Sequence, residues 1–259
     1  MKRSKPIDAL VLDTSLPSVE QIGDFLFITL NRPDQHNRLD PSDIDVIQSA
    51  LDSINDSLAV GLGPRAVVLQ ARGSSTFCSG FTIGAISDQL DDRFERMLDS
   101  LESLPLPTVA VIQGGVYGGG TDLALCCDIR LGVAESRMFM PAARFAIHYY
   151  PGGLRRYVSN LGLAASKKLF LTGLEIGAPE MLRIGFLTEI VEASHLDGRV
   201  KAYLEAIGGT HGDVVASMKS HLRGFADGCP DIEAAANAAR KSVKSEESRR
   251  RIKALRKTR

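Results

Sequence analysis

The chain has 259 residues, of which 44% are hydrophobic and 24% are charged, and its 31 lysines and arginines balance its 31 aspartates and glutamates. This composition is typical of a globular protein with a sizeable buried core. Because the formal net charge is zero, the protein as a whole has no strong electrostatic field that would attract nucleic acid or an anionic membrane. The sequence has no apolar run of about 18 residues, so we expect no membrane span. The N-terminal segment lacks the apolar stretch of a signal peptide, and we expect none.

The cysteines give a guide to the redox environment. The sequence has four of them, Cys78, Cys126, Cys127 and Cys229. Their spacing matches neither a zinc site nor a disulfide framework. We therefore expect reduced thiols, no metal site and a cytoplasmic protein.

Apolar runs predict the strands and helices in chain order. Residues 1–20 are expected to form a loose lead-in. Apolar, β-branched runs predict buried strands at 25–30, 66–71, 108–112 and 129–133. Apolar positions three and four residues apart predict helices at 41–58, 94–104, 163–172, 179–184 and 232–256. Asp40 is the expected N-cap of the first helix, with Pro41 at its first position. The alternation of strands and helices predicts α/β architecture with right-handed crossovers.

The stretch from Thr108 to Asp128 combines a strand, a glycine-rich turn and the start of a helix. Gly114-Gly115 follows the strand, and Gly118-Gly119-Gly120 precedes the next apolar run. Glycine lets the backbone approach a ligand closely, and free N–H groups at a helix start favour negative charge. This turn could hold a phosphate or a developing oxyanion. The alternative is a tight turn whose glycines only supply positive φ angles.

Five segments in order resemble the crotonase superfamily, which includes the enoyl-CoA hydratase/isomerase enzymes. They are Leu30–Pro33, Thr76–Phe81, Gly114–Asp122, Cys127–Arg130, and a last stretch with Leu171-Thr172-Gly173, Ala178 and Gly185-Phe186-Leu187. The resemblance runs from about Gly23 to Val191. It implies an α/β fold with a crotonase-like ββα spiral core in residues 1–195. It also implies a helical C-terminal trimerisation region in residues 196–259, and hence a homo-trimer or hexamer.

The resemblance also implies the substrate class. An acyl-CoA thioester would bind with its thioester oxygen between two backbone N–H groups, those of Phe81 and Gly119. Such donors stabilise a developing oxyanion by roughly 3–4 kcal/mol each in the best-studied case. Neighbouring positions would contact the substrate: Ser79, Gly80, Gly118, Tyr149, His36 and Arg38. Coenzyme A would enter as part of the substrate, with no separate cofactor.

His36 and Arg38 belong to the loop that would pass the nucleotide end of coenzyme A. Lone surface charges are the alternative for both residues. Phe81, Ile86, Phe94 and Met97 are expected to line the acyl pocket.

The general acid/base positions depart from the hydratase pattern. The first hydratase glutamate is replaced by Asp122, which keeps a carboxylate on a shorter side chain. The second is replaced by Ala142, which cannot transfer a proton. A third position, which carries an aspartate in other branches, holds Tyr150. The cluster His148-Tyr149-Tyr150 is therefore the expected source of a second proton-transferring group, with Tyr150 first and His148 second. The sequence leaves open which of the three faces the pocket.

Three other residues invite a functional interpretation. Arg155 and Arg156 are expected to form a solvated helix start rather than a substrate clamp. Cys78 beside the oxyanion segment is expected to be a small buried thiol, because no helix N-terminus or base would activate it.

The resemblance predicts an enoyl-CoA hydratase/isomerase-like enzyme that works through an oxyanion-stabilised enolate. Loss of the second glutamate keeps an isomerase, lyase or decarboxylase open as alternatives. A non-catalytic CoA-binding or RNA-binding homologue is a further alternative, because residues 241–259 are markedly basic. A basic tail is more often a solvated helix face, so we expect no nucleic-acid partner.

Overall fold

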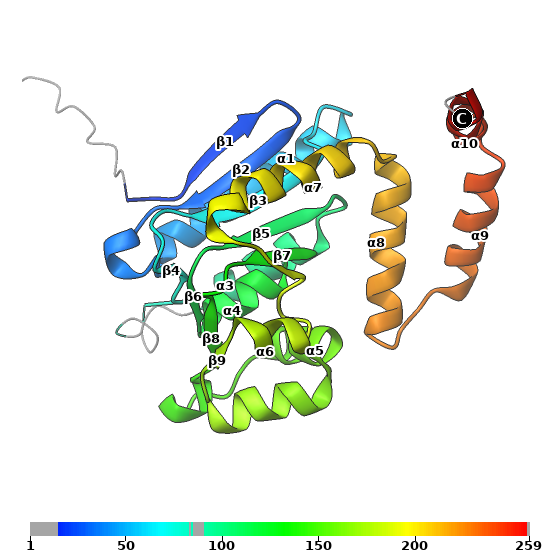
Figure 1. The fold of residues 1–259 in the computed structure, drawn as a ribbon. Helices are drawn as coiled ribbons and strands as arrows, with labels where there is room; N and C mark the ends of the chain where they lie inside the picture. Colours follow the sequence, from blue (N-terminus) through cyan, green and yellow to red (C-terminus); the bar gives the residue numbers. More distant parts are fainter. Residues whose placement is uncertain (1–14, 83, 85–90, 258–259) are drawn as a thin grey trace, which may run out of the picture.

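The computed structural model of the protein describes residues 15–82, 84 and 91–257, with side chains as far as residue 254. A six-stranded sheet runs through the centre in the order β1-β2-β3-β5-β7-β10 (Figure 1). Its strands are β1 (Ser18–Ile22), β2 (Phe25–Leu30), β3 (Ala66–Ala71), β5 (Thr108–Ile112), β7 (Ile129–Gly132) and β10 (Glu189–Ile190). The β1–β2 pair is antiparallel, and all other neighbours in this sheet are parallel.

A second, four-stranded sheet has the order β4-β6-β8-β9. Its strands are β4 (Thr76–Cys78), β6 (Gly115–Tyr117), β8 (Arg137–Phe139) and β9 (Ile176–Gly177). Strands β3, β5 and β7 of the large sheet are followed directly by β4, β6 and β8 of the small one. A helix follows each of the pairs β5–β6 and β7–β8. This repeat of two strands and a helix is the predicted ββα spiral, and the α/β fold class is confirmed.

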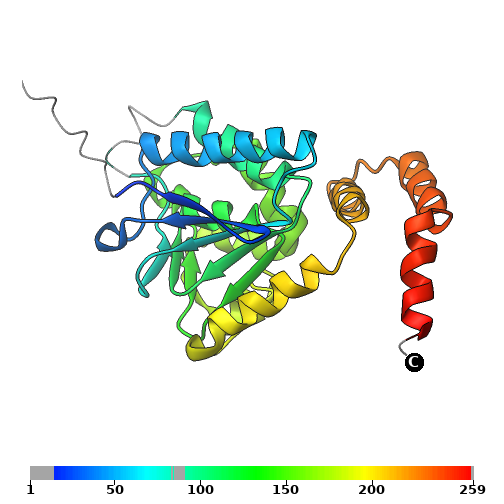
Figure 2. The same cartoon turned by 90° about the horizontal axis from the view of Figure 1, so that it is seen from above.

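Helices cover both faces of the large sheet because its strands are apolar on both sides. Val67 and Leu69 of β3 pack into one core cluster, and Val68 packs into the other. Helices α1 and α3 lie over the first face and α7 over the second (Figure 2). The remaining helices of the core surround the small sheet. The core helices are α1 (Pro41–Ala59), α3 (Asp92–Ser103), α4 (Gly119–Leu125), α5 (Pro151–Thr172), α6 (Ala178–Arg183) and α7 (Leu196–Gly208), with 3-10 turns η1 (Pro33–Gln35), η3 (Ala142–Phe145) and η4 (Ala193–His195).

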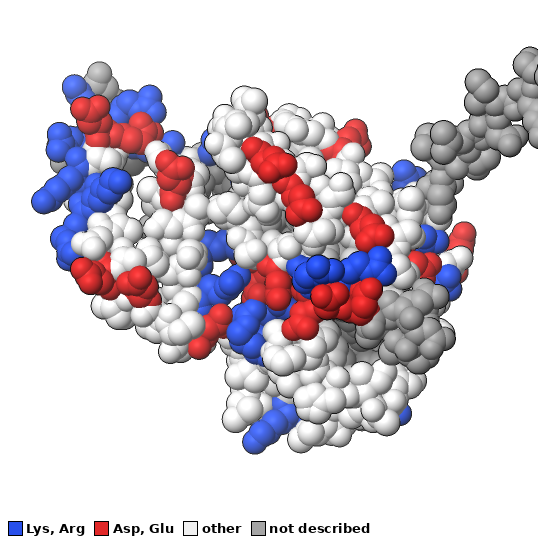
Figure 3. Space-filling model, turned by 180° about the vertical axis from the view of Figure 1, so that it is seen from behind, with Lys and Arg blue, Asp and Glu red and all other residues white. Residues whose placement is uncertain are grey.

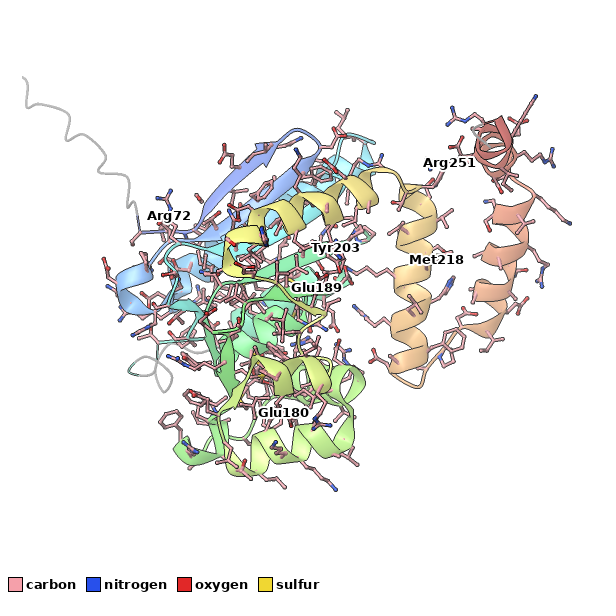
Figure 4. The ribbon with its side chains drawn as sticks, viewed as in Figure 1. Arg72, Glu180, Glu189, Tyr203, Met218 and Arg251 are labelled. Atoms are coloured by element: carbon pink, nitrogen blue, oxygen red, sulfur yellow. The ribbon has the colours of Figure 1, made fainter. Side chains whose placement is uncertain are left out.

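The N-terminus of α1 confirms its predicted cap. Asp40 and Asp43 form a reciprocal capping box, and Pro41 occupies the first helical position. At the other side of the sheet, Tyr203 of α7 donates to Glu189 of β10 over 3.0 Å (Figure 4). Among the described helices, none has the length and apolar character that a membrane crossing requires.

The last three helices form a C-terminal arm, residues 212–257, that reaches away from both sheets (Figures 1 and 2). They are α8 (Gly212–Ala226), α9 (Ile232–Val243) and α10 (Glu246–Lys257). No residue of α8 or α9 is buried in the single chain. The basic residues of α10 are partly paired, because Glu247 accepts from Arg250 over 2.8 Å and from Arg251 over 2.6 Å. The predicted division of the chain at residue 195 stays a prediction.

Three sequence-based expectations for the elements are wrong. The lead-in contains β1, an edge strand whose five residues are all exposed and which therefore lacks an apolar signal. The helix predicted at 163–172 is the second half of α5, which begins at Pro151 and kinks at Gly162 (φ 79°). The single helix predicted at 232–256 is broken, because the Ser245 hydroxyl accepts from Ser248 N at 3.1 Å and starts α10.

Candidate active site

Two backbone segments meet where the small sheet ends. The chain turns at Gly80 after β4, with φ +82°, and α4 begins at Gly119 after β6. A Cβ atom on Gly80 would lie 2.6 Å from the Gly119 nitrogen, so only glycine permits this approach. Among the described residues, neither the Phe81 amide nor the Gly119 amide donates a hydrogen bond to a neighbour. The two amides predicted as oxyanion donors therefore belong to neighbouring segments, and neither has an acceptor among the residues that the structure describes.

The loop before α1 is tied to this segment. The Ser79 amide donates to the His36 carbonyl over 3.0 Å, and the Leu39 amide donates to the Gly80 carbonyl over 2.8 Å. His36 itself is exposed, with Nδ1 placed 2.9 Å from Thr76 Oγ1. Arg38 is half-exposed and pairs with Asp40 at 3.5 Å. The structure thus brings the predicted nucleotide-end loop and the predicted oxyanion segment together.

Asp122 lies in the first turn of α4 with no exposed surface. Arg156 of α5 is equally buried and binds this carboxylate with two nitrogens. Its Nε lies 2.8 Å from Asp122 Oδ1 and its Nη2 lies 3.1 Å from Asp122 Oδ2. This two-point contact fixes the plane of the carboxylate and supplies the charge that its burial requires.

Two tyrosines complete the surroundings of Asp122. The Tyr150 hydroxyl donates a short hydrogen bond to Asp122 Oδ2. The Tyr149 hydroxyl lies 3.4 Å from the same oxygen and 3.2 Å from the Tyr150 hydroxyl. Burial, followed by the Asp122 charge, raises the pKa of both phenols well above 10.0. Both tyrosines are therefore neutral hydrogen-bond donors at physiological pH.

Phe94 of α3 links the backbone site to this cluster. Its ring packs edge-on against Phe81 with centroids 6.2 Å apart, and edge-on against Tyr150 with centroids 6.3 Å apart. A Cβ atom on Gly119 would lie 2.9 Å from Phe94 Cζ. The Phe94 ring therefore connects the Phe81–Gly119 segments with the Tyr150–Asp122 pair.

The expectation that Arg155 and Arg156 are solvated is wrong. The outer nitrogen of Arg156, Nη1, lies 2.7 Å from Asp99 Oδ1 and 3.2 Å from Glu102 Oε2. Arg155 is half-buried, also bonds Glu102, and reaches Asp227 of the arm at 3.0 Å. Burial would lower the pKa of Arg156, but the hydrogen bond and charge of Asp122 outweigh it and raise that pKa.

The remaining predicted residues lie in different surroundings. Gly118 is the N-cap of α4, with φ 50°. His148 is exposed, and its Nδ1 lies 2.8 Å from the Tyr149 carbonyl rather than near Asp122. The structure therefore does not bring His148 to the carboxylate. Ala142 is buried in η3, and its methyl side chain has no polar atom.

The structure also places two of the residues singled out in the sequence, the predicted pocket residue Met97 and the predicted buried thiol of Cys78. Met97 has no exposed surface and belongs to the core. Ile86 lies outside the described residues. Cys78 is the expected buried thiol, and burial raises its pKa to about 12. Among the described side chains, no group of histidines, cysteines and carboxylates is arranged to hold a metal ion.

Sequence analysis missed Arg156 as the partner of Asp122, because what identifies it is visible only in the structure. A Cβ atom on Gly153 would lie 3.0 Å from Asp122 Oδ2, so this turn of α5 faces the carboxylate. Residue 156 is three positions further and lies on the same helix face. A buried aspartate also requires a cation, and Arg156 is the cation on that face.

A ββα spiral that places two free amides beside a buried carboxylate and a phenol is suited to enzymes that stabilise an oxyanion and move a proton. The sequence profile described as enoyl-CoA hydratase/isomerase matches residues 22–255. The chain is 29% identical over 194 residues to the short-chain-enoyl-CoA hydratase of Clostridium acetobutylicum, and the match covers 71% of each protein. It is also 29% identical over 180 residues to the enoyl-CoA isomerase/hydratase claC of Penicillium crustosum, a match that covers 67% of this chain and 20% of that relative.

The fold agrees with a solved structure. The enoyl-CoA hydratase of Bacillus anthracis is similar with a TM-score of 0.82 at 23% identity, covering 94% of this chain and 96% of that one. The chain belongs to the enoyl-CoA hydratase/isomerase family, whose enzymes act on acyl-CoA thioesters. The predicted family and enzyme class are thereby confirmed.

Proposed function

We propose that this chain binds the thioester oxygen of an acyl-CoA between the amides of Phe81 and Gly119 and stabilises the enolate that forms there. The observation that carries this proposal is the close approach of Gly80 to Gly119, which leaves both amides without a described protein acceptor. Removing one such donor costs about 3–4 kcal/mol of transition-state stabilisation in a well-studied enzyme. Ser79, Gly80 and Gly118 frame this site.

The proton-transferring group is the Tyr150–Asp122 pair. As the Cα–H bond of the acyl group breaks, its electrons move into the thioester carbonyl and its proton passes to the Tyr150 oxygen. The Tyr150 hydrogen moves at the same time to Asp122 Oδ2, with which it already shares a hydrogen bond. Return of the proton to another carbon completes an isomerisation.

Ala142 makes water addition the less suitable reaction. Hydration needs one group to position water and another to deliver a proton, and Ala142 has neither capacity. Isomerisation, carbon–carbon cleavage and decarboxylation need only the oxyanion site and one proton-transferring group. Relatives named as hydratases keep hydration as the alternative. Coenzyme A arrives as part of the substrate with its nucleotide end near His36 and Arg38, and no separate cofactor enters the proposal.

The same proposal includes the assembly and the compartment. We expect a trimer or a hexamer in the cytoplasm. Support for the assembly comes from the C-terminal arm, which carries large apolar side chains in the open. These exposed residues are Met218, Leu222, Phe225, Ile232, Val243 and Ile252.

The test is α-proton exchange in deuterated water across a panel of saturated and unsaturated acyl-CoAs, read by mass spectrometry. Exchange on at least one of them is expected, because enolate formation does not require that the whole reaction be completed. Gly119→Ala is expected to abolish exchange, since the added Cβ would meet the Phe94 ring and displace the donor segment. Absence of exchange across the panel in the folded protein would reject the proposed function.

A further inference from the structure

We propose that Arg156 is a positioning residue that balances the charge of the buried Asp122 carboxylate and aims it at the Tyr150 hydroxyl. Its guanidinium lies among three carboxylate groups, with Asp122 on the inner side and Asp99 and Glu102 on the outer side. The proposal rests on the proposed function, because the role of Arg156 is exerted through the proton transfer assigned to Tyr150.

The inner contact determines what Asp122 can do. Arg156 Nε binds Oδ1 at 2.8 Å, and Nη2 binds Oδ2 at 3.1 Å. Oδ1 accepts from the guanidinium, whereas Oδ2 accepts both from the guanidinium and from the Tyr150 hydroxyl. A planar guanidinium with two contacts prevents rotation of the carboxylate, which a single lysine ammonium would not do. Arg156 therefore determines which oxygen faces Tyr150.

The same contact determines the direction of the Tyr150 hydrogen bond. A carboxylate with no exposed surface strongly favours its neutral form unless a cation compensates the lost hydration. A protonated Asp122 could donate to the Tyr150 oxygen instead of accepting from its hydroxyl. The relay from substrate to Tyr150 to Asp122 would then have no acceptor. Arg156 thus preserves the acceptor state on which the relay depends.

The outer contacts keep the guanidinium itself in place. Nη1 is bound by Asp99 at 2.7 Å and by Glu102 at 3.2 Å. Burial would raise the pKa of Glu102, but Arg155 and Arg156 lower it, so this anchor is ionised. Arg155 binds Glu102 and Asp227 together, which extends the chain of ion pairs to the end of α8.

The ion-pair chain reaches solvent at a charged hollow. A cavity of about 1130 Å³ is lined by residues of α1, α3, α5 and α8, including Asp99, Glu102 and Arg155. Charges of both signs gather on this face beside the arm (Figure 3). Asp99 is half-exposed here, whereas Arg156 is fully covered. Arg156 therefore separates the buried carboxylate of the site from this hydrated, charged surface.

Two variants and one matched control test the proposal with an acyl-CoA that the wild-type protein turns over. Arg156→Gln removes the cation and is expected to lower kcat about a hundredfold, the range of a lost acid/base contribution, with KM changed less than about threefold. The acid limb of its pH–rate profile is expected to move to higher pH, because Asp122 must still be ionised to act. Arg156→Lys keeps the positive charge. Its acid limb is expected at the wild-type pH, whereas its kcat is expected to recover only in part.

The control is Arg130→Gln. Arg130 is almost as deeply buried, with 6% of its surface exposed, but it donates to main-chain carbonyls such as Phe186 O and Gly185 O. Its loss is expected to reduce stability without moving the pH limb. If Arg130→Gln shifts the acid limb of the pH–rate profile as much as Arg156→Gln does, the shift follows from a general loss of packing in the protein. The proposal is then rejected.

The double variant Asp122→Asn/Arg156→Gln protects the test against misfolding, because it removes both buried charges together. If Arg156 acts through Asp122, this double variant retains the kcat of Asp122→Asn alone. A further hundredfold loss would show an independent role and overturn the proposal. So would a folded Arg156→Gln with wild-type kcat and an unchanged profile.

One measurement separates this inference from the proposed function. The infrared difference spectrum between Arg156→Gln and Asp122→Asn/Arg156→Gln at neutral pH reports the protonation of Asp122 without any substrate. A band from a protonated carboxyl group is expected there, and none in the corresponding wild-type minus Asp122→Asn spectrum. A carboxylate in both backgrounds would reject the role of Arg156, whatever the acyl-CoA assays show.

Discussion

The rings of Tyr149 and Tyr150 stack with centroids 4.4 Å apart, and their hydroxyl oxygens lie 3.2 Å from each other. The Tyr150 hydroxyl has one hydrogen, which it donates to Asp122, so its oxygen remains free to accept from Tyr149. The Tyr149 hydroxyl has one hydrogen as well, which it can donate either to Tyr150 or to Asp122 Oδ2 at 3.4 Å. The Tyr150 ring packs edge-on against Phe94, next to the oxyanion segment.

Tyr150→Phe is expected to lower kcat about a hundredfold, because it removes the hydroxyl that receives the substrate proton. Tyr149→Phe should cost about tenfold, since it only supports the Tyr150 oxygen. His148→Gln should leave kcat unchanged, because His148 is exposed and bonds its neighbour's carbonyl. Steady-state kinetics on one acyl-CoA would rank the three variants. A large loss in His148→Gln with full activity in Tyr150→Phe would reverse the assignment.

The raised phenol pKa values predict a loss of stability at alkaline pH. Burial raises the pKa of Tyr149, Tyr150 and Tyr157 above the ordinary 10.0. Above about pH 10 the unfolded chain releases phenolic protons that the native state retains. The phenols should therefore leave the free energy of unfolding unchanged below about pH 10 and lower it above that pH by about 1.4 kcal/mol per pH unit for each phenol. The thiols of Cys78, Cys126 and Cys127, whose pKa values burial raises from 9.0, should add a fall that begins at a lower pH. Urea unfolding at several pH values would measure this slope, and Tyr157→Phe should reduce it.

The sequence predicted the four central strands of the large sheet because they are continuous apolar runs, but it did not predict β10, which has two residues. The 66–71 and 108–112 strands have the predicted bounds in the structure. It did not predict β1, whose exposed residues carry no apolar pattern, or the small sheet, whose strands have two or three residues. Such short strands are stabilised by pairing and packing with neighbouring elements rather than by the β propensity of their own residues.

The candidate site was predictable where the backbone supplies the chemistry and not where side chains from distant segments meet. The family resemblance of the segments Thr76–Phe81 and Gly114–Asp122 indicated the two amide donors. The partnership of Asp122 with Arg156 joins residues 34 positions apart on different helices. No local pattern distinguishes Arg156, which is buried, from Arg155, which is half-exposed, although they are adjacent.

Asp122→Asn is expected to reduce both activity and stability. The amide cannot replace the charge that Arg156 requires, and an unpaired buried cation costs about 3–5 kcal/mol. Thermal unfolding should therefore show a lower Tm, and turnover at a temperature where the variant is folded should still fall at least a hundredfold. The matched control is Asp92→Asn, whose side chain is 76% exposed in a surface pair with Arg96. This control should change stability by less than about 1 kcal/mol. A stable, active Asp122→Asn would contradict the assignment.

Gly153→Ala is expected to displace Tyr149 without unfolding the protein. The added Cβ would lie 2.2 Å from Tyr149 Cε1, and the ring must move to accommodate it. Overpacking of this kind costs about 1–3 kcal/mol, and activity should fall at least as far as in Tyr149→Phe. Gly198→Ala in α7 is the control, because a Cβ there meets nothing within 4 Å and should stabilise the helix slightly. Wild-type activity in Gly153→Ala would show that the Tyr149 ring position is unimportant.

Leu222→Glu on the C-terminal arm is expected to prevent assembly. Met218, Leu222 and Phe225 recur at spacings of four and three, so they share one face of α8, and each has more than half of its surface exposed. Met218 projects from the side of α8 turned away from the sheets (Figure 4). Lys219, about a quarter turn around the helix from these residues, reaches the core and bonds Asp128 at 2.7 Å. The apolar face of α8 is thus exposed in the single chain, and we expect another copy of the chain to cover it.

Light scattering at micromolar concentration would measure the assembly. The wild-type protein should have the mass of a trimer or hexamer, and Leu222→Glu should have that of a monomer, because a charge in an apolar contact costs several kcal/mol per copy. Leu62→Glu is the matched control: Leu62 is 78% exposed in the turn after α1, and its replacement should leave the mass unchanged. A monomeric wild-type protein, or an intact oligomer in Leu222→Glu, would show that the apolar face of α8 does not join the subunits.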